Sequence, residues 1–300
     1  MSNLSIAVIG VGGIGSAFGF KLAKGGHKVI CIARPGSKRL EQLQKDNNNI
    51  ILVEGDRANV DISDTLNEEI EYDVIIVTTL AHQVDSILPS LQRSKAKYIH
   101  FMFNNFNPER LLNIIGSERA TFGMPFIMSS LTNEGKVNFK LNPGQKCLHN
   151  KQQFVDLFNS VGLPSEIEEN MLLWLRCHTP LCIGFESISI QAMRHNSGAG
   201  AGASWSEYVL VAYGVHAGFS IIQLLGYKLY PSAKSYFSYL PNFVLAVIFW
   251  SMSRIMTFRE LLATGKEECK ALIDTMIEAA NSNNSITPTT VAALVAIKPE

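Results

Sequence analysis

The stretch Ser5-Ile-Ala-Val-Ile-Gly10-Val-Gly12-Gly-Ile-Gly15 decides the fold of the first half of the chain. A short apolar run that ends at a glycine is typical of a strand buried on both faces of a parallel sheet. The amphipathic segment 14–24 follows it and stops at a glycine pair, which is a helix-ending signal. The sequence therefore predicts a strand, a tight turn and a helix in direct succession.

The turn itself is a GxGxxG pattern, which in this setting indicates a dinucleotide site. Gly10 permits the tight turn, Gly12 lets a pyrophosphate approach the backbone, and Gly15 lets the helix pack closely on the strand. The helix N-terminus offers free N–H groups to an anion, so we include Gly13 and Ile14 in the predicted site. The alternative is a glycine-rich turn that binds no ligand.

Further strand-like and helix-like segments alternate through the first half. The expected strands are 28–33, 73–79 and 98–103, with a helix-like segment at 83–91. Short connections between such elements predict a Rossmann-type parallel sheet. From about Ser165 the alternation gives way to long segments with helical spacing. We therefore expect an α/β domain over residues 1–163 and an all-α substrate and dimerisation domain over residues 164–300.

The end of the second strand indicates which dinucleotide binds. An NAD site usually has a carboxylate there, but this chain has Ala33-Arg34-Pro35-Gly36-Ser37-Lys38-Arg39. Arg34 can pair with a 2′-phosphate, and Ser37 and Lys38 can add donors. The sequence predicts NADP(H), the alternative being that these basic residues form a solvated loop.

Two later strand ends are expected to face the cofactor, because ligands bind at the carboxyl ends of parallel strands. One contains Thr79 and is followed by His82, which we interpret as a surface loop residue. The other contains Asn104, whose amide can bond to a nicotinamide or a substrate oxygen. Asn105 fits a turn asparagine equally well.

The composition excludes several classes of protein. The chain has 26 basic and 26 acidic residues in 300, which argues against a nucleic-acid binder and against an acidic disordered chain. Only 17% of residues are charged, against about 25% in soluble domains. The deficit lies in 195–253, where the charged residues are Glu207, Lys228 and Lys234. We interpret this region as buried helices or a dimer interface; membrane insertion is the disfavoured alternative, since Pro241 and scattered polar residues interrupt it.

The five cysteines form neither a CxxC pair nor a zinc spacing. Scattered thiols of this kind favour a reduced cytoplasmic protein without a metal site, and the N-terminus lacks the pattern of a secretory signal. Near the C-terminus, segment 259–280 predicts an amphipathic helix on which Glu268 borders the apolar face. Its carboxylate is either partly buried with a role or turned to water. Thr287-Pro288 predicts the start of a terminal helix.

These residues together resemble the ketopantoate reductases (2-dehydropantoate 2-reductases), NADPH enzymes of pantothenate biosynthesis. The resemblance is carried by Ile6 to Gly15, by Lys24-Gly-Gly-His-Lys-Val29 and by Ala33-Arg34. It implies that Arg34 binds the 2′-phosphate, that Gln83 is the family glutamine after the fourth strand, and that Asn104 is the asparagine of a family turn. The resemblance covers nearly the whole chain but is thin in the second half.

The resemblance also implies two catalytic positions. Arg176 stands where the family has a lysine general acid, and Glu268 corresponds to its glutamate. Leu80, Asn105 and Pro180 replace a phosphate-binding lysine, a turn glycine and a substrate-binding asparagine. An arginine does not release a proton near neutral pH, but it can clamp a carboxylate or polarise a carbonyl.

If Arg176 acts in this way, the proton must come from another group. Candidates are His178, Glu268 and water. The alternative for Arg176 is a structural ion pair with Glu166, with Glu169 or with another neighbouring residue.

The sequence therefore predicts a cytoplasmic NADPH-dependent reductase of a 2-oxo acid, ketopantoate being the first candidate. The substrate is expected between the nicotinamide and Arg176, with Glu268 anchoring a hydroxyl or ammonium group. A different class stays open: a diverged NADP(H)-binding paralogue that senses the cofactor and transfers little or no hydride. A methyltransferase with the same glycine turn is disfavoured, because no acidic residue follows the second strand.

Overall fold

The computed structural model describes residues 3–141, 144–194, 202–255, 262, 265–283 and 285–300. The contacts between residues group the chain into two units. The N-terminal unit comprises residues 1–103 and 109–171, and the helical unit comprises residues 104–108 and 172–300. Each unit is described by itself below.

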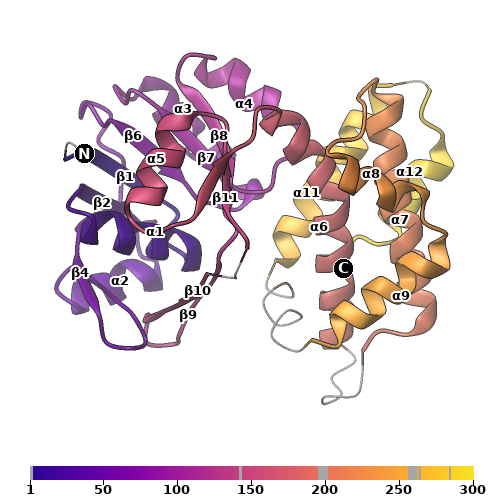
Figure 1. The fold of residues 1–300 in the computed structure, drawn as a ribbon, viewed down its shortest axis with the longest axis horizontal. Coiled ribbons are helices and arrows are strands. Elements are labelled where there is room, and N and C mark those ends of the chain that lie inside the picture. Colours follow the sequence, from indigo (N-terminus) through magenta and orange to yellow (C-terminus); the bar gives the residue numbers. More distant parts are fainter. Residues whose placement is uncertain (1–2, 142–143, 195–201, 256–261, 263–264, 284) are drawn as a thin grey trace. The chain divides into compact units, whose positions relative to one another are not determined.

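The N-terminal unit is built on one eight-stranded sheet (Figure 1). Its strands, in the order in which they lie side by side, are β12 (Ser165–Ile167), β11 (Cys147–His149), β8 (Ala120–Met124), β7 (Ile99–Met102), β6 (Val74–Val77), β1 (Ser5–Ile9), β2 (Lys28–Ile32) and β5 (Asp61–Ser63). Every neighbouring pair is parallel except β11 and β8, which are antiparallel. The prediction of a Rossmann-type parallel sheet is confirmed.

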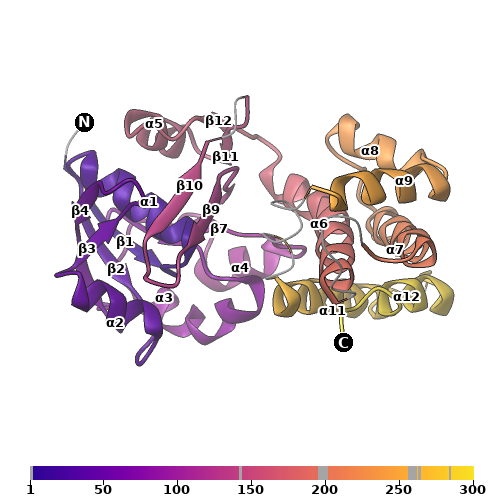
Figure 2. The ribbon, with the colours of Figure 1, turned by 90° about the horizontal axis from the view of Figure 1, so that it is seen from below.

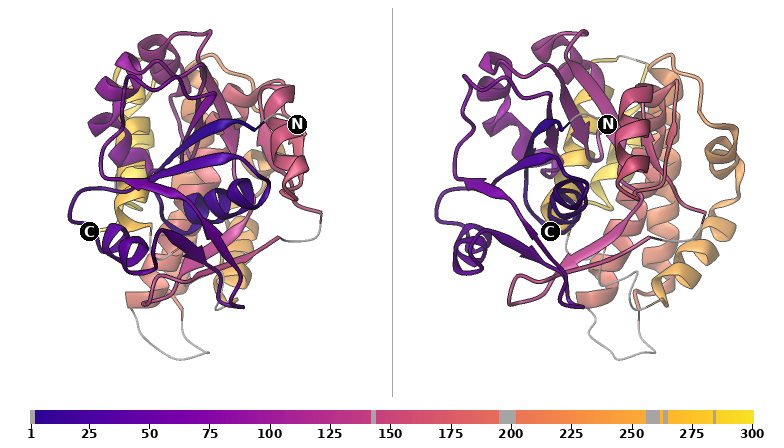
Figure 3. Two further views of the ribbon diagram at one scale, coloured as in Figure 1. Left: turned by 90° about the vertical axis from the view of Figure 1, so that its left-hand side faces the viewer. Right: turned by 60° about the vertical axis from the view of Figure 1, so that its left-hand side comes forward.

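Helices and two short ribbons surround this sheet. The helices are α1 (Gly13–Lys24), α2 (Lys38–Lys45), α3 (Leu88–Arg93), α4 (Pro108–Ile115) and α5 (Gln152–Ser160), with a 3-10 helix η1 (Ala81–Ser86). The ribbons pair β3 (Asn49–Ile51) with β4 (Arg57–Asn59) and β9 (Met128–Leu131) with β10 (Val137–Lys140). A bridge between Leu52 and Val137 joins the two ribbons, which meet below α1 in Figure 3.

The predicted helix over 83–91 is wrong in its form. The structure has the 3-10 helix η1 and then a separate short helix, α3, with Pro89 in its first turn. Proline lacks the N–H that a continuous helix would need at that place, but it is well tolerated in a first turn.

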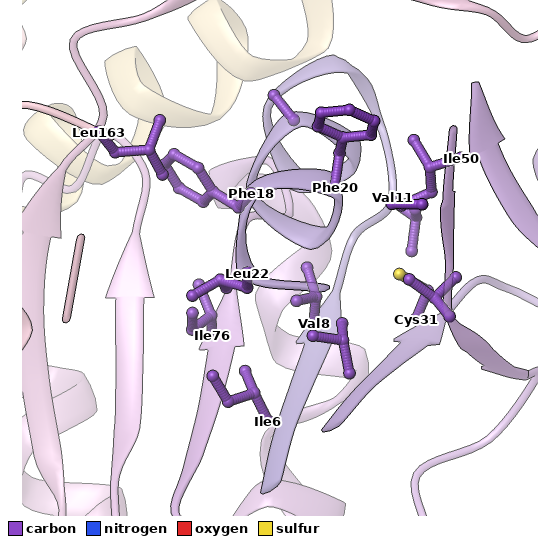
Figure 4. Close-up of a cluster of buried hydrophobic side chains, with 14 of the residues drawn as sticks. Ile6, Val8, Val11, Phe18, Phe20, Leu22, Cys31, Ile50, Ile76 and Leu163 are labelled. Carbon is purple, nitrogen blue, oxygen red and sulfur yellow. The ribbon is translucent and has the colours of Figure 1, made fainter. Parts of the chain in front are cut away.

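The core of the N-terminal unit lies between α1 and the sheet (Figure 4). Phe18 and Leu22 of α1 are fully buried and cover the apolar side chains of Ile6 and Val8 on β1. Each such side chain contributes about 1.5–3 kcal/mol by its burial. This packing fixes the start of α1, and therefore the glycine turn, on the end of β1.

The helical unit consists of long helices without a sheet. Its described helices are α6 (Met171–Arg194), α7 (Trp205–Leu224), α8 (Ser232–Tyr239), α9 (Asn242–Ser253), α11 (Lys266–Asn281) and α12 (Pro288–Val295). In Figure 2, α6 and α7 lie between the α8–α9 pair and the α11–α12 pair. A capping box between Ser204 and Glu207 begins α7. The predicted all-α second half is confirmed from α6 onward, whereas residues 165–167, which the prediction included, form the strand β12 of the N-terminal sheet.

Several local predictions can be compared with these helices. Thr287 caps α12 by accepting a hydrogen bond from the Thr290 N–H, as predicted. The start of the predicted helix 259–280 falls mostly outside the described residues, and its described part is α11. The α6 helix runs on through Pro180, whose ring packs where a Cβ on Gly218 of α7 would lie.

The charge-poor region 195–253 includes the mostly buried helix α7, as predicted, but α8 and α9 also expose large side chains. Among the described helices, none is by itself long and apolar enough to cross a membrane. The adjacent helices α8 and α9 reach that length and composition together, with a bend of 116° between them.

Candidate active site

The glycine turn of the N-terminal unit has the strained geometry that its sequence predicts. Gly10 has a φ of +90°, and a Cβ there would lie 2.7 Å from the Thr79 backbone nitrogen. At Gly15 a Cβ would lie 2.3 Å from the Gly10 carbonyl oxygen, far inside contact distance. Both positions therefore require glycine, one for its conformation and one for close packing.

The other two glycines of the turn differ in what surrounds them. No atom lies within 4 Å of a Cβ placed on Gly12, so the backbone is open to an approaching group. A Cβ on Gly13 would lie 2.5 Å from the Ser129 carbonyl oxygen of β9. Gly12 thus leaves the backbone of the turn open to a ligand. Gly13 packs against β9, and its N–H lies at the start of the helix.

Two buried hydroxyls lie beside this turn without a hydrogen-bond partner in the described structure. They are Thr79 Oγ1, which the sequence predicts in the site, and Ser129 Oγ, which it does not. The N-cap of α1 is Gly12, which has no side chain to cap the first N–H groups, among them that of Ile14. Free N–H groups, a positive helix end and unsatisfied hydroxyls fit a pyrophosphate.

The basic loop after β2 is divided between two roles. Ser37 caps α2 by accepting from the Leu40 N–H, and Arg39 donates to the Gly135 carbonyl at 2.7 Å and to Ser16 Oγ at 3.0 Å. Burial lowers the pKa of Arg39. Arg34 and Lys38 are exposed. These two cations, rather than Ser37 or Arg39, remain available to a phosphate.

The segment after β6 contains residues that differ in their exposure. Gln83 lies within η1 with a half-buried side chain, while His82 is exposed, as expected of a surface loop residue. Leu80 is also exposed. The role of Gln83 in the cofactor site stays a prediction.

In the helical unit, a set of polar side chains gathers around the middle of α6. We call it the α6 polar cluster: Asn104, Arg176, Cys182, Glu186, Lys234 and Glu268. Cys182 lies at its centre, since its Sγ donates to Asn104 Oδ1 at 3.4 Å and its thiol interacts electrostatically with Glu186, Lys234 and Glu268. Burial, then the Glu186 carboxyl, raises the pKa of the Cys182 thiol well above its usual range. The thiol therefore keeps its proton and serves as a donor.

Arg176 is a buried residue of this cluster, with 4% of its surface exposed. Its guanidinium carbon lies 3.9 Å from the centre of the Tyr227 ring and 5.8 Å from that of Phe106. The suggested partner Glu166 is instead paired with Lys146 at 2.9 Å. Aromatic rings contact the face of a guanidinium, while its N–H donors point outward in the plane of the group.

Glu268 is buried in the first turn of α11, where the helix dipole favours a carboxylate. The predicted burial of Glu268 is therefore confirmed, and its role stays a prediction. Glu186 of α6, which the sequence analysis missed, is also buried. Burial, then the nearby Glu268 carboxyl, raises the pKa of Glu186 well above its usual range. The pair thus places at least one proton-bearing carboxyl in the cluster.

Lys234 is the second residue that the sequence analysis missed. It lies in α8 with 8% of its surface exposed, and its Nζ donates to the Trp174 carbonyl oxygen at 3.1 Å. The available signal was its isolation, because it is one of three charged residues in 195–253. Within the described residues, no group of three or more His, Cys, Asp or Glu side chains could hold a metal ion. All five cysteines are free.

Solved structures share this fold. A PanE/ApbA family ketopantoate reductase from Ralstonia eutropha JMP134 has a TM-score of 0.73 at 16% identity, covering 98% of this chain and 95% of that one. A D-mandelate dehydrogenase in complex with NADH has a TM-score of 0.69 at 16% identity, covering 98% and 97%. A dimeric ketopantoate reductase from Staphylococcus aureus has a TM-score of 0.62 at 15% identity, covering 98% of each chain.

Sequence comparison gives the family of the N-terminal unit. No curated protein sequence matches the chain. The family profile described as ketopantoate reductase PanE/ApbA matches residues 6–147, which contain the glycine turn and the basic loop. Residues 6–147, just under half of the chain, are therefore similar to the ketopantoate reductase family PanE/ApbA, a family of oxidoreductases.

Proposed function

We propose that this protein reduces the carbonyl of a 2-oxo acid with NADPH, ketopantoate (2-dehydropantoate) being the first substrate to test. The observation that carries the proposal is the glycine turn with its open Gly12 and the two unsatisfied hydroxyls beside it. The similarity of residues 6–147 to the ketopantoate reductase family supports the class of reaction, the reduction of a 2-oxo acid. We take residues 1–163 as the cofactor-binding domain and 164–300 as the substrate domain.

The cofactor is proposed to be NADP(H), which supplies a hydride when bound. Gly10 to Gly15, with Thr79, would hold the pyrophosphate. The exposed Arg34 would hold the 2′-phosphate, since a carboxylate that would select NAD is missing from its loop. Gln83 and Asn104 would orient the nicotinamide end.

The substrate groups are proposed from the chemistry of the α6 polar cluster. Arg176 would bind the substrate carboxylate, because its guanidinium offers paired donors of matching geometry. Glu268 would anchor a hydroxyl or ammonium group, and Asn104 would orient the substrate oxygen. The aromatic rings around Arg176 keep water from its face and so strengthen the ion pair.

The alternative function is a cofactor-binding paralogue with little or no hydride transfer. The observation that favours it is Arg176 itself, because an arginine does not release a proton to the reduced oxygen. A spectrophotometric assay separates the two functions. The purified protein is mixed with NADPH and a panel of 2-oxo acids including ketopantoate, and absorbance is followed at the nicotinamide band. Turnover supports the reductase, whereas NADPH binding without oxidation on every acid supports the paralogue.

Variants of Arg176 refine the assay. If the residue clamps the carboxylate, Arg176→Gln raises KM for 2-oxo acids by about 10- to 100-fold, which corresponds to the roughly 1.5–3 kcal/mol of a charged hydrogen bond. Its effect on kcat is smaller. A gain of ketopantoate turnover in Arg176→Lys would instead place this position at the proton-transfer step.

We also propose a homodimer formed through the helical domain and a cytoplasmic location. Phe243, Val247 and Trp250 of α9 are exposed at helical spacing, a surface suited to a partner. A dimeric relative is known from Staphylococcus aureus. Light scattering on the wild type and on Val247→Glu tests the dimer, which the charge is expected to dissociate.

A further inference from the structure

The proposed reduction leaves one chemical requirement unassigned. A carbonyl that accepts a hydride also needs a proton on its oxygen. Arg176 does not supply it, so the question is which described group of the helical unit does. The following inference rests on the proposed function and deepens it.

Lys234 is held at the N-terminal half of α6 although it belongs to another helix. Its Nζ donates to the Trp174 carbonyl at 3.1 Å and lies 3.1 Å from the centre of the Trp174 ring. Trp174 precedes Arg176 by two residues. The ammonium of Lys234 therefore lies against the helix segment that carries the proposed carboxylate clamp.

Two thiols affected by the charge of Lys234 show which part of the α6 polar cluster it lies near. Its charge acts on the thiol of Cys177, which the charge of Arg176 also reaches. It acts as well on the thiol of Cys182, which donates to Asn104 Oδ1. Lys234 is thus within electrostatic reach of groups beside Arg176 and beside Asn104, the two residues proposed to hold the substrate.

This pairing of cations matches a 2-oxo acid. The carboxylate and the carbonyl of such an acid are on adjacent carbons, so a clamp for one places the other nearby. Two cationic side chains of different kinds then have separate tasks: a guanidinium for the carboxylate, and an ammonium for the oxygen that becomes negative as the hydride arrives.

Lys234 is a buried cation in the first turn of α8, where the helix dipole disfavours a positive charge. A lysine at such a place costs stability, which is expected of residues kept for function.

Other donors of the cluster fit the task less well. Burial, then the charge of Lys234, holds the pKa of His178 well below its usual range, so its ring is neutral at pH 7. Burial, then the Glu268 carboxyl, raises the pKa of Glu186, whose carboxyl lies beside the Cys269 thiol and Gly265 while its Oε2 is buried without a hydrogen-bond partner in the described structure. Glu186 is therefore the comparison that the experiment must include.

We propose that Lys234 is the proton donor of the reduction. NADPH, when bound, would supply a hydride to the carbonyl carbon. The C=O π pair would move to the oxygen, which would take a proton from the Lys234 ammonium, so that a 2-oxo acid and NADPH would give a 2-hydroxy acid and NADP⁺. The neutral Lys234 amine then regains a proton from solvent.

The test uses the full chain and the 2-oxo acid that the wild type reduces fastest. Lys234→Met removes the ammonium, Lys234→Arg keeps a cation without a releasable proton, and Lys228→Met removes an exposed lysine as the matched control. We expect kcat to fall about 10²- to 10⁴-fold in both Lys234 variants, with NADPH binding unchanged. Lys228→Met should behave as the wild type.

A rescue experiment excludes a merely structural role. In Lys234→Ala, turnover should rise with added methylammonium and not with tetramethylammonium, which has the charge but no proton. Full kcat in Lys234→Arg, or equal rescue by both ions, would overturn the role of Lys234 but leave the proposed function standing. So would a loss confined to Glu186→Gln, which would assign the donor to Glu186. If the wild type reduces no 2-oxo acid, the proposed function falls and the role of Lys234 falls with it.

Discussion

His100 Nε2 lies 2.9 Å from His149 Nδ1 in the N-terminal unit, and neither residue has any exposed surface. The chain of contacts continues to Thr121 Oγ1, 2.9 Å from His100 Nδ1, and to Ser165 Oγ, 3.2 Å from His149 Nε2. One N–H therefore lies between the two rings, and burial keeps both rings neutral near pH 7. The other N–H donates to Thr121 Oγ1 or to Ser165 Oγ, depending on the tautomers.

The histidine pair predicts that acid destabilises the fold. Burial lowers the pKa of His149 from 6.5 to about 3, and burial, then His149, lowers the pKa of His100. The unfolded chain binds protons at these two histidines more tightly than the folded chain does. The free energy of unfolding is therefore not reduced by them above about pH 6.5, and it falls as the pH drops toward 3. The expected slope is about 1.4 kcal/mol per pH unit for each histidine. Urea unfolding between pH 4.5 and 7.5 measures it.

Two variants identify the source of this slope. His149→Gln should reduce the pH dependence, since it removes one of the two buried bases. The exposed His82 offers a matched control, and His82→Gln should leave the slope as in the wild type. Equal slopes in all three proteins would contradict the assignment.

The glycine turn predicts opposite outcomes for two substitutions three residues apart. Gly15→Ala places a Cβ 2.3 Å from the Gly10 carbonyl oxygen and should lower the free energy of unfolding by about 1–3 kcal/mol. Gly12→Ala meets no atom and should change it by less than about 1 kcal/mol. It should nevertheless weaken NADPH binding, because the methyl group occupies the approach to the backbone. Urea unfolding and fluorescence titration with NADPH separate the two effects.

Arg34 should determine the preference between the two nicotinamide cofactors. Arg34→Ser removes the proposed partner of the 2′-phosphate and should weaken NADPH binding about 10- to 100-fold, with NADH binding unaltered. Lys45, an exposed lysine at the other end of α2, is the matched control for loss of one charge. Dissociation constants for both cofactors at fixed ionic strength provide the measurement. An equal loss for NADPH and NADH would argue against a phosphate contact.

The Glu186–Glu268 pair predicts a pH dependence of the opposite sign. The folded pKa of Glu186 lies well above 4.5, so the folded state holds this proton more tightly and stability falls as the pH rises above 4.5. Glu186→Gln should flatten this fall and make the protein more stable than the wild type at pH 7–8. The exposed Glu278 of α11 supplies the control Glu278→Gln. A wild-type pH profile in Glu186→Gln would contradict the prediction.

The sequence predicted most of the N-terminal unit because its signals are local. The apolar run before Gly10 and the glycine spacing after it specify a strand, a turn and a helix within 20 residues. The break between η1 and α3 lies at Pro89, a local signal from which the end of the first helix could have been predicted. Ser129 was missed because it reaches the turn from β9, more than 100 residues away in the chain.

The α6 polar cluster was harder to predict, because its members come from separate helices and one loop. Arg176 was found through resemblance and Glu268 first through its place at the border of an apolar helix face, whereas Lys234 and Glu186 carry no motif. Their importance comes from burial, which depends on how α6, α8 and α11 pack. Periodicity shows that a helix has an apolar face; it does not show which charged residue of a neighbouring helix lies against it.

Residues 104–108 group with the helical unit although they follow β7, a central strand of the N-terminal unit. The chain consequently enters the helical unit twice, first for one short loop and then for the remainder of its length. A fragment beginning after Leu163 would lack Asn104 and Phe106, which contact Cys182 and Arg176. The two units are therefore not interchangeable modules, and recombination at a single point between them would yield a helical part without a portion of its own interior.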